Sequence, residues 1–342
     1  MLFRQWRSSA AGASAVFVLG FCIAVAAGQR LQRDLDAPAQ AAFERSVERV
    51  ADEVVQRFHR PIRGLNGAKG MVAARQRISR AEFRAFFAAQ DLARDYPGVR
   101  GFGFIQRVIR DDVDRFIAAE RADGEPTFAI RQLVDKDLDD LYIVKFNEPP
   151  LPNSGALGLD LGSEARRRAT VQRSVDSGEP TLSAAITLVQ DQRRSPGVVL
   201  YVPAYAQGAS VATVNERRAA LLGLMSAPIV IAELLDGVRD GVDGQVDFDL
   251  FELSANAGAS AGSPVYEAGE RLTDSAFGTD PVWARRFRGT RTLSLPGRDY
   301  LLRVAATPQF EAAHASPTPW LVFGCGVAIS ASPTAAAPPA TP

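Results

Sequence analysis

The chain of 342 residues has few of the side chains that build disulfides and metal centres. Its two cysteines, Cys22 and Cys325, lie in apolar stretches near opposite ends, which excludes a disulfide framework or a thiolate metal site within the folded body. Its two histidines, His59 and His314, have no further ligand residue at the spacing of a metal site. We therefore expect a body that folds by burial of a hydrophobic core, with no cofactor and no metal.

The sequence also lacks an excess of one charge and the motifs of common enzymes. Thirty-nine basic residues balance 39 acidic ones, so the net charge does not favour nucleic acid as a partner. Neither an HExxH zinc motif, nor a Walker-type phosphate loop, nor the protein kinase motif set is present. Gly101-Phe102-Gly103 lacks the third glycine of a dinucleotide-binding loop and lies within an expected strand. These absences favour a protein that is not an enzyme, and we predict no catalytic residue.

The first part of the chain contains a segment that is long and apolar enough to cross a membrane. Residues 8–29 carry no charge and follow Arg4 and Arg7, and about 20 apolar residues suffice for a transmembrane helix with a cytoplasmic basic flank. We expect residues 1–29 to form the cytoplasmic start and an inner-membrane anchor, and the chain after about residue 30 to be extracytoplasmic. A cleaved signal peptide is the alternative, because Ala24-Val25-Ala26 has the form of a cleavage site.

The far end, residues 311–342, has the pattern of a linker and a second membrane crossing that stops early. Residues 320–331 are apolar but too few to cross about 30 Å of hydrocarbon, and the Pro- and Ala-rich tail after them is expected to be disordered. The sequence contains no kinase or cyclase domain after this segment. The chain is therefore either a truncated or frame-shifted piece of a longer protein, or a protein that acts alone.

Residues 30–75 are predicted to form a long stalk helix. Apolar side chains recur there at steps of three and four, which places them on one stripe of the helix: Phe43, Val47, Val50, Val54 and Phe58. Pro61 is expected to bend or interrupt the helix. The stripe either packs on the chain's own domain or also pairs with a second copy, which would give a homodimer.

After the stalk, strand and helix patterns mix in the order of an α+β fold. Alternating or short apolar runs predict strands over 99–108, 128–133, 142–146, 181–189, 198–202, 221–225, 246–253, 264–267, 291–295 and 300–305. Helices are expected over 80–93, 164–175 and 227–238. We interpret this order as two antiparallel-sheet lobes, a ligand-sensing one over residues 76–213 and a membrane-proximal one over residues 214–310.

Four motifs follow one another between Tyr96 and Tyr205. They are YPGVRGFGFIQRV, FNEPPLPNSGALGLDLGSE, the turn SGEP before a strand, and PGVVLYVPAY. Together they resemble the CHASE domain, the extracytoplasmic sensory module of transmembrane histidine kinases and nucleotide cyclases, including the plant cytokinin receptors. The resemblance implies two PAS-like lobes, with the ligand in the membrane-distal lobe.

The resemblance also implies four ligand-binding positions. Arg167 takes the helix position of an acidic residue that contacts adenine in plant cytokinin receptors. Ser183 and Tyr201 take two threonine positions of the pocket strands, and Val189 takes that of a pocket leucine. An arginine has only hydrogen-bond donors, so it cannot accept a bond from an exocyclic amine. Arg167 with Ser183 and Tyr201 suits a carboxylate or phosphate better. Alternatively, residues 166–168 form a solvated basic helix face.

We therefore expect a membrane-anchored extracytoplasmic sensor, a receptor input module that binds a small molecule for signal transduction. Two alternatives stay open. The chain is an N-terminal fragment of a CHASE-containing histidine kinase or diguanylate cyclase, or it is a secreted ligand-binding protein that acts alone.

Overall fold

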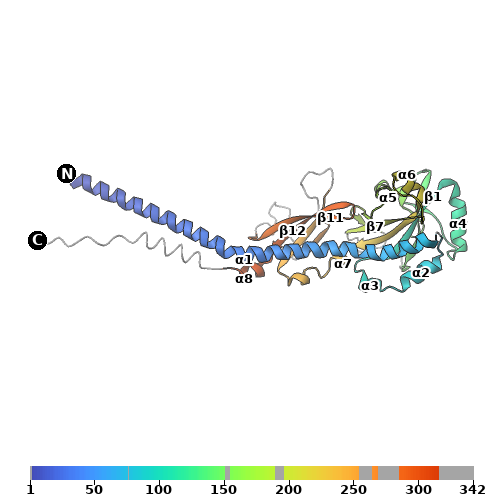
Figure 1. The fold of residues 1–342 in the computed structure, drawn as a ribbon, viewed down its shortest axis with the longest axis horizontal. Coiled ribbons are helices and arrows are strands. Elements are labelled where there is room, and N and C mark those ends of the chain that lie inside the picture. The colour runs from blue at the N-terminus through green and yellow to red at the C-terminus, as the bar shows by residue number, and fades with distance from the viewer. Residues whose placement is uncertain are drawn as a thin grey trace.

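In the computed structural model, one long helix runs along the molecule and two β-sheets lie beside it (Figure 1). The structure describes residues 2–75, 77–150, 155–188, 196–253, 264–268 and 285–315. The strands described there form an eight-stranded sheet, here called sheet A, and a four-stranded sheet, here called sheet B. Sheet B lies nearer the N-terminal end of the helix and sheet A lies at the far end (Figure 1).

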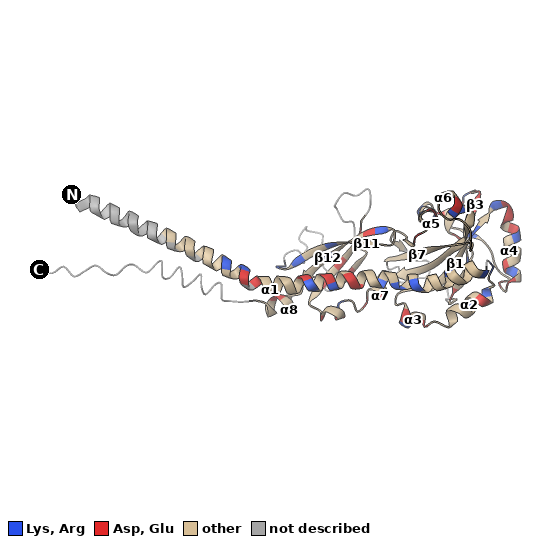
Figure 2. Cartoon of the chain, viewed as in Figure 1, with Lys and Arg blue, Asp and Glu red and all other residues tan. Residues whose placement is uncertain are grey.

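Helix α1, Leu2–Arg75, packs its predicted apolar stripe against the chain's own sheets. Residues of the stripe such as Phe43, Val54 and Phe58 are completely buried in the same core as the strands. A homodimer through the stalk helix stays a prediction. A dimer would have to use the opposite face of α1, which carries charged side chains (Figure 2). Sedimentation of the purified chain tests that possibility, and a monomer at high concentration would contradict it.

The prediction that Pro61 interrupts the helix is wrong, because α1 runs through both Pro38 and Pro61. Each proline removes only one helix hydrogen bond, while the buried stripe holds the helix against the sheets. Within the part of the chain that the structure describes, no helix carries a stretch both long and apolar enough to cross a membrane. The predicted anchor over residues 8–29 belongs to α1 and stays a prediction. The predicted second crossing over residues 320–331 lies outside the described residues.

Sheet A has the strand order β2-β4-β3-β1-β8-β7-β5, and β6 pairs with β7. Its strands are antiparallel to their neighbours except for β2 and β4. They are β1 (Phe102–Ile109), β2 (Arg131–Gln132), β3 (Asp140–Glu148), β4 (Leu159–Asp160), β5 (Thr181–Leu182), β6 (Ile186–Thr187), β7 (Pro196–Tyr205) and β8 (Leu221–Val230). One face of the sheet packs on α1, and the other face packs on α5.

Sheet B has the antiparallel order β10-β9-β12-β11. Its strands are β9 (Val246–Glu252), β10 (Tyr266–Ala268), β11 (Arg288–Leu295) and β12 (Arg298–Ala306). Apolar side chains from β9, β11 and β12 pack on the same stripe of α1 that also reaches sheet A, so a single core runs through both sheets.

Short helices close the remaining surfaces of the two sheets. They are α2 (Arg80–Ala88), α3 (Leu92–Asp95), α4 (Val113–Ala122), α5 (Ala165–Ser177), α6 (Val214–Ala220), α7 (Ile231–Leu234) and α8 (Pro308–Ala313). Helix α4 lies at the tip of the molecule, α5 covers the face of sheet A opposite α1, and α6 lies beside α5 (Figure 1). Ser79 and Thr213 start α2 and α6 with capping boxes, in which the cap hydroxyl and a glutamate three residues later exchange hydrogen bonds.

Three sequence predictions about these elements need correction. The predicted helix over 227–238 is wrong, since β8 continues to Val230 and only the short α7 follows. Both faces of β8 are buried, so its sequence is a continuous apolar run that periodicity cannot tell from a buried helix. Because β8 pairs with β7 and β1, it belongs to sheet A, whereas the predicted lobe boundary at residue 213 assigns it to the second lobe. The predicted strands over 128–133 and 181–189 contain only the short β2, β5 and β6.

Candidate ligand-binding site

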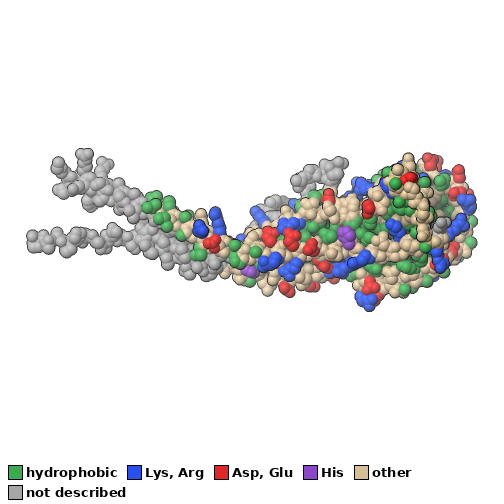
Figure 3. All heavy atoms as spheres, in the orientation of Figure 1, with side chains coloured by type: hydrophobic (Ala, Val, Ile, Leu, Met, Phe, Trp, Pro, Cys, Tyr) green, Lys and Arg blue, Asp and Glu red, His purple; other side chains and the backbone are tan. Residues whose placement is uncertain are grey.

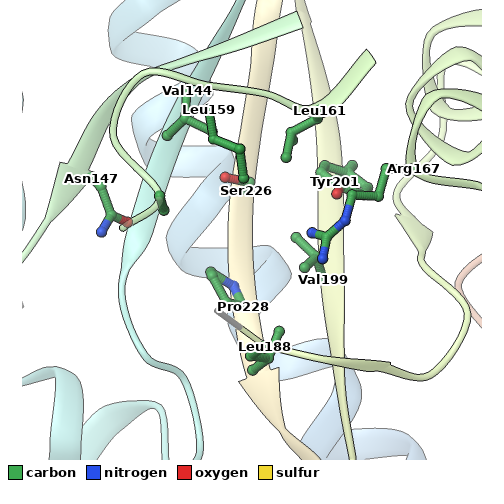
Figure 4. A pocket seen from close by; sticks show the side chains of 11 residues that line it. Val144, Asn147, Leu159, Leu161, Arg167, Leu188, Val199, Tyr201, Ser226 and Pro228 are labelled. Atoms are coloured by element: carbon green, nitrogen blue, oxygen red, sulfur yellow. The ribbon is translucent and has the colours of Figure 1, made fainter. Parts of the chain in front are cut away.

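A cavity lies on the face of sheet A that points away from α1 (Figure 4). Its volume is about 40 Å³, within about 440 Å³ of unfilled space that opens to solvent. A buried water needs about 10 to 15 Å³ on the same measure, so the cavity has room for a molecule of a few non-hydrogen atoms. Seven apolar side chains form most of its wall: Val144, Ala156, Leu159, Leu161, Leu188, Val199 and Pro228.

Successive side chains of a strand point to opposite faces of the sheet, so alternate residues of β7 and β8 point to the face that holds this cavity. On β7, Val199 and Tyr201 face the cavity while Leu200, between them, packs toward α1. On β8, Ser226 and Pro228 line the cavity in the same way.

The wall opposite the strands is a tight loop that ends in β4. Gly158 has a φ of +74°, and a side chain there would place its Cβ 2.1 Å from the carbonyl oxygen of Ala129. The buried carboxylate of Asp160 accepts hydrogen bonds from the backbone N–H groups of Tyr142 and Gly162, at 2.9 and 2.8 Å. These bonds tie the loop to β3, so the apolar side chains on either side of Asp160 keep their place over the sheet.

Helix α5 carries three consecutive arginines that have different surroundings. The Glu164 carboxylate accepts from the backbone N–H groups of Arg166 and Arg167 at 3.0 Å each, which fixes the start of the helix. Partial burial raises the pKa of Glu164, but these two bonds outweigh it and hold the pKa below its usual range. Arg166 is exposed, whereas Arg168 forms an ion pair with Asp140. Arg167 lies between them and lines the cavity, so the solvated-face alternative describes Arg166 but not its two neighbours.

The guanidinium of Arg167 makes no hydrogen bond or ion pair with any described residue, and it extends from α5 over the strand that carries Val199 and Tyr201 (Figure 4). The Tyr201 hydroxyl is fully buried and has no hydrogen-bond partner among the described residues. Burial raises the pKa of Tyr201 to about 12, against the opposing charge of Arg167, so the hydroxyl stays protonated near neutral pH. The cavity therefore holds a cation and a neutral donor that the described protein atoms leave unsatisfied.

Two further polar side chains line the cavity, Asn147 at the end of β3 and Ser226 on β8. Neither side chain forms a hydrogen bond with the rest of the described chain. No acidic side chain is among the described residues of the lining. The polar groups around the cavity are thus donors or uncharged groups, inside a mostly apolar wall.

Of the four residues predicted from the resemblance, the structure brings Arg167 and Tyr201 to the same cavity. Ser183 does not line it, because its buried hydroxyl accepts from the Val199 N–H and donates to the Ala184 carbonyl, at 2.9 and 2.8 Å. Val189 lies outside the described residues.

Asn147 and Ser226 were not predicted from the sequence. Asn147 belongs to the second of the four motifs and starts a loop rich in Pro and Gly, which is the kind of segment that often carries binding residues. Ser226 could have been found by extending the predicted strand past residue 225, because residues 224, 226 and 228 then share one face of it. The prediction of a helix from residue 227 prevented this extension.

No group of three or more His, Cys, Asp or Glu side chains in the described residues could hold a metal ion. One further motif was missed in the sequence: residues 258–262 read Gly-Ala-Ser-Ala-Gly, the form of a hydrolase nucleophile turn. That segment lies outside the described residues. The short Ala-, Ser- and Gly-rich stretch around it lacks the helix pattern that such a turn requires.

The comparisons with known proteins give one family. The model of the CHASE domain matches residues 76–266. The hybrid signal transduction histidine kinase A of Dictyostelium discoideum is 20% identical over 205 residues, which are 56% of this chain and only 10% of that protein. The solved ligand-binding domain of the Pseudomonas aeruginosa PAO1 amino acid chemoreceptor PctC in complex with GABA is 10% identical, with a TM-score of 0.39, and the match covers 75% of this chain and 94% of that one. A methyl-accepting chemotaxis protein X is 12% identical, with a TM-score of 0.42 and coverage of 81% and 99%. Because the family model matches more than half of its residues, the chain belongs to the CHASE domain family, as its four ordered motifs predict.

Proposed function

We propose that this chain is the sensory input module of a signalling protein, and that the cavity on sheet A binds its small-molecule ligand. The observation that carries the proposal is the fully buried Tyr201 hydroxyl, which has no partner among the described residues and lies in the same cavity as Arg167. A buried hydroxyl without a partner costs free energy in the folded protein. A ligand that accepts hydrogen bonds from both groups would remove that cost.

The proposed ligand is a small anion. Arg167 and Tyr201 both donate, and the described lining residues include no acid that would balance a cationic ligand. A carboxylate accepts several hydrogen bonds at once and suits a planar guanidinium. The cavity of about 40 Å³ favours a short carboxylate over a nucleobase, whose ring system alone has about ten non-hydrogen atoms.

Replacing Arg167 by alanine is expected to weaken binding of a small carboxylate by about 10- to 100-fold, the effect of losing one or two charge-assisted hydrogen bonds. Thermal unfolding of the full chain with acetate and propionate measures this, because a ligand at 100 times its Kd adds about 2.7 kcal/mol to the free energy of unfolding. Arg166→Ala is the matched control, since Arg166 is the exposed neighbour on the same helix. The proposal is wrong if neither acid stabilises the chain, or if the stabilisation survives Arg167→Ala.

We also propose that the two sheets are PAS-like lobes and that α1 anchors the module in the inner membrane, with the chain after about residue 30 extracytoplasmic. Large apolar side chains near the N-terminal end of α1 support the anchor, since Val18, Leu19 and Ile23 are 58%, 63% and 59% exposed (Figure 3). Alkaline extraction of cell membranes tests it: an anchored chain stays in the membrane fraction. A chain shortened at Ala26 and released into solution would instead support the secreted alternative.

A path of hydrogen bonds connects the cavity to sheet B. The backbone N–H of Leu182 donates to the Pro296 carbonyl at 2.9 Å, and Arg298 Nε donates back to the Leu182 carbonyl at 3.0 Å. The N–H of Ala185 donates to the carboxylate of Glu252 at 2.9 Å, and Glu252 is also paired with Arg298. The segment held in this way leads directly to the cavity wall at residue 188.

We propose that a ligand which shifts this wall also shifts sheet B, and that the shift reaches α1 and a kinase or cyclase output. Hydrogen exchange at Leu182 and Ala185, compared with and without bound propionate, tests this route. Unchanged exchange at both amides, under conditions where propionate binds, would contradict it.

A further inference from the structure

We infer that the ligand is a short carboxylate, of two to four carbons, that also carries an uncharged hydrogen-bonding group such as a hydroxyl or carbonyl. This inference rests on the proposed function, because it assumes that the cavity on sheet A is the binding site. It adds that a second polar place in the cavity, formed by Ser226 and Asn147, selects among carboxylates.

Strand pairing places the polar residues of the cavity in one row across the sheet. Tyr201 is the register partner of Ser226, Ser226 is the partner of Gly103, and Gly103 is the partner of Asn147. Paired residues point to the same face, and neighbouring strands lie about 4.8 Å apart. The row therefore runs from the Tyr201 end of the cavity across Ser226 and Gly103 to Asn147, and Figure 4 shows Asn147 and Arg167 on opposite sides of Ser226.

The glycine in this row lets two polar side chains approach its backbone closely. A Cβ atom at Gly103 would lie 2.7 Å from the Ser226 hydroxyl oxygen and 3.7 Å from the Asn147 side-chain oxygen. Any larger residue at this position would displace the Ser226 hydroxyl, so the glycine allows Ser226 and Asn147 to lie side by side in the row. Neither side chain has a hydrogen-bond partner in the described part of the chain, so both are open to a ligand group in the cavity that they line.

The two polar places differ in charge, which fixes the kind of group that each accepts. The Arg167 and Tyr201 end offers a cation and a neutral donor, so it takes the carboxylate. The place formed by Ser226 and Asn147 offers an amide and a hydroxyl without a net charge, so a hydroxyl or carbonyl is satisfied there. An ammonium group would lose its water without gaining a counter-charge from the described lining residues, which is costly in a cavity with apolar walls.

Four acids with the same carbon skeleton test this inference: propionate, the two hydroxypropionates (lactate and 3-hydroxypropionate), and alanine. Calorimetric titration of the full chain is expected to show that at least one hydroxypropionate binds about tenfold tighter than propionate, the value of one added neutral hydrogen bond. Alanine is expected to bind more weakly than propionate.

Ser226→Ala and Asn147→Ala are each expected to remove the tenfold preference, so that the hydroxypropionates bind no tighter than propionate. Equal affinity for propionate and both hydroxypropionates, tighter binding of alanine, or an equal loss for all acids in Ser226→Ala would each overturn the inference. These results differ from a failure of the proposed function itself, in which no acid binds or binding does not depend on Arg167.

Discussion

Replacing Glu120 by alanine is expected to lower the free energy of unfolding by about 3 to 5 kcal/mol, the cost of leaving buried charges without their partner. Glu120 of α4 is 1% exposed and lies 3.0 Å from Arg80 Nη2 and 3.0 Å from Lys145 Nζ. The two cations come from the start of α2 and from β3, so one carboxylate joins three elements. Its loss leaves both cations beside the ring of Phe146 with no negative charge between them.

The network is expected to stabilise the fold less than its short distances suggest. Burial raises the pKa of Glu120, and the charges of Lys145 and Arg80 only partly oppose that effect. The free energy lost when the three charges leave water offsets much of their mutual attraction. When Glu120 is removed, the two cations remain out of water and lose that attraction.

Urea unfolding of Glu120→Ala measures the expected loss, and Asp95→Ala is the control. Asp95 pairs with Arg94 at 2.9 Å, but the two side chains are 38% and 76% exposed, so its removal is expected to change the unfolding midpoint very little. Similar midpoints for Glu120→Ala and the unaltered chain would show that this network does not join the three elements.

Replacing Phe58 by alanine is expected to cost about 3 to 5 kcal/mol of unfolding free energy, the usual range for a phenylalanine lost from a packed core. Phe58 is 0% exposed, and its ring centre lies 6.1 Å from that of the buried Tyr300 on β12. It belongs to the stripe of α1 that packs against both sheets, so the cavity left behind lies in the core that the two sheets share.

His59→Ala is the matched control for Phe58→Ala, because His59 is the next residue of the helix, is exposed, and bonds only the Val55 carbonyl among the described residues. We expect Phe58→Ala to shift the midpoint of urea unfolding strongly and His59→Ala to shift it little. Two separate transitions in Phe58→Ala would be consistent with a shared core, since loss of packing at the joint frees the sheets from each other. A midpoint as high as that of His59→Ala would contradict the assignment of Phe58 to that core.

Part of the fold could be predicted from local patterns, because the stalk helix and several strands repeat their apolar residues at the period of one face. The stripe from Phe43 to Phe58 identified the buried face of α1, and alternation identified β9 and β12. The pattern failed at β8, where both faces are buried and alternation disappears. It failed again at Pro61, since tertiary packing overrides a local preference to end a helix.

The site was predictable only in part. Arg167 and Tyr201 lie far apart in the sequence, and a family resemblance, not periodicity, suggested that they share a pocket. Ser226 and Asn147 could not be added to them, because the row that joins them depends on the pairing of β7, β8, β1 and β3, and strand register is not visible in the sequence. Ser183 lies outside the lining of this cavity, and its hydroxyl accepts a hydrogen bond from the Val199 N–H of β7.

The central claim is that the cavity between sheet A and α5 holds a small anionic ligand. A crystal structure of the chain grown with lactate tests it most directly. We predict electron density in the cavity with a carboxylate bound by Arg167 and the Tyr201 hydroxyl and a hydroxyl near Ser226. A cavity that contains only ordered water at saturating lactate, or lactate bound elsewhere with Tyr201 still unpartnered, would contradict the account.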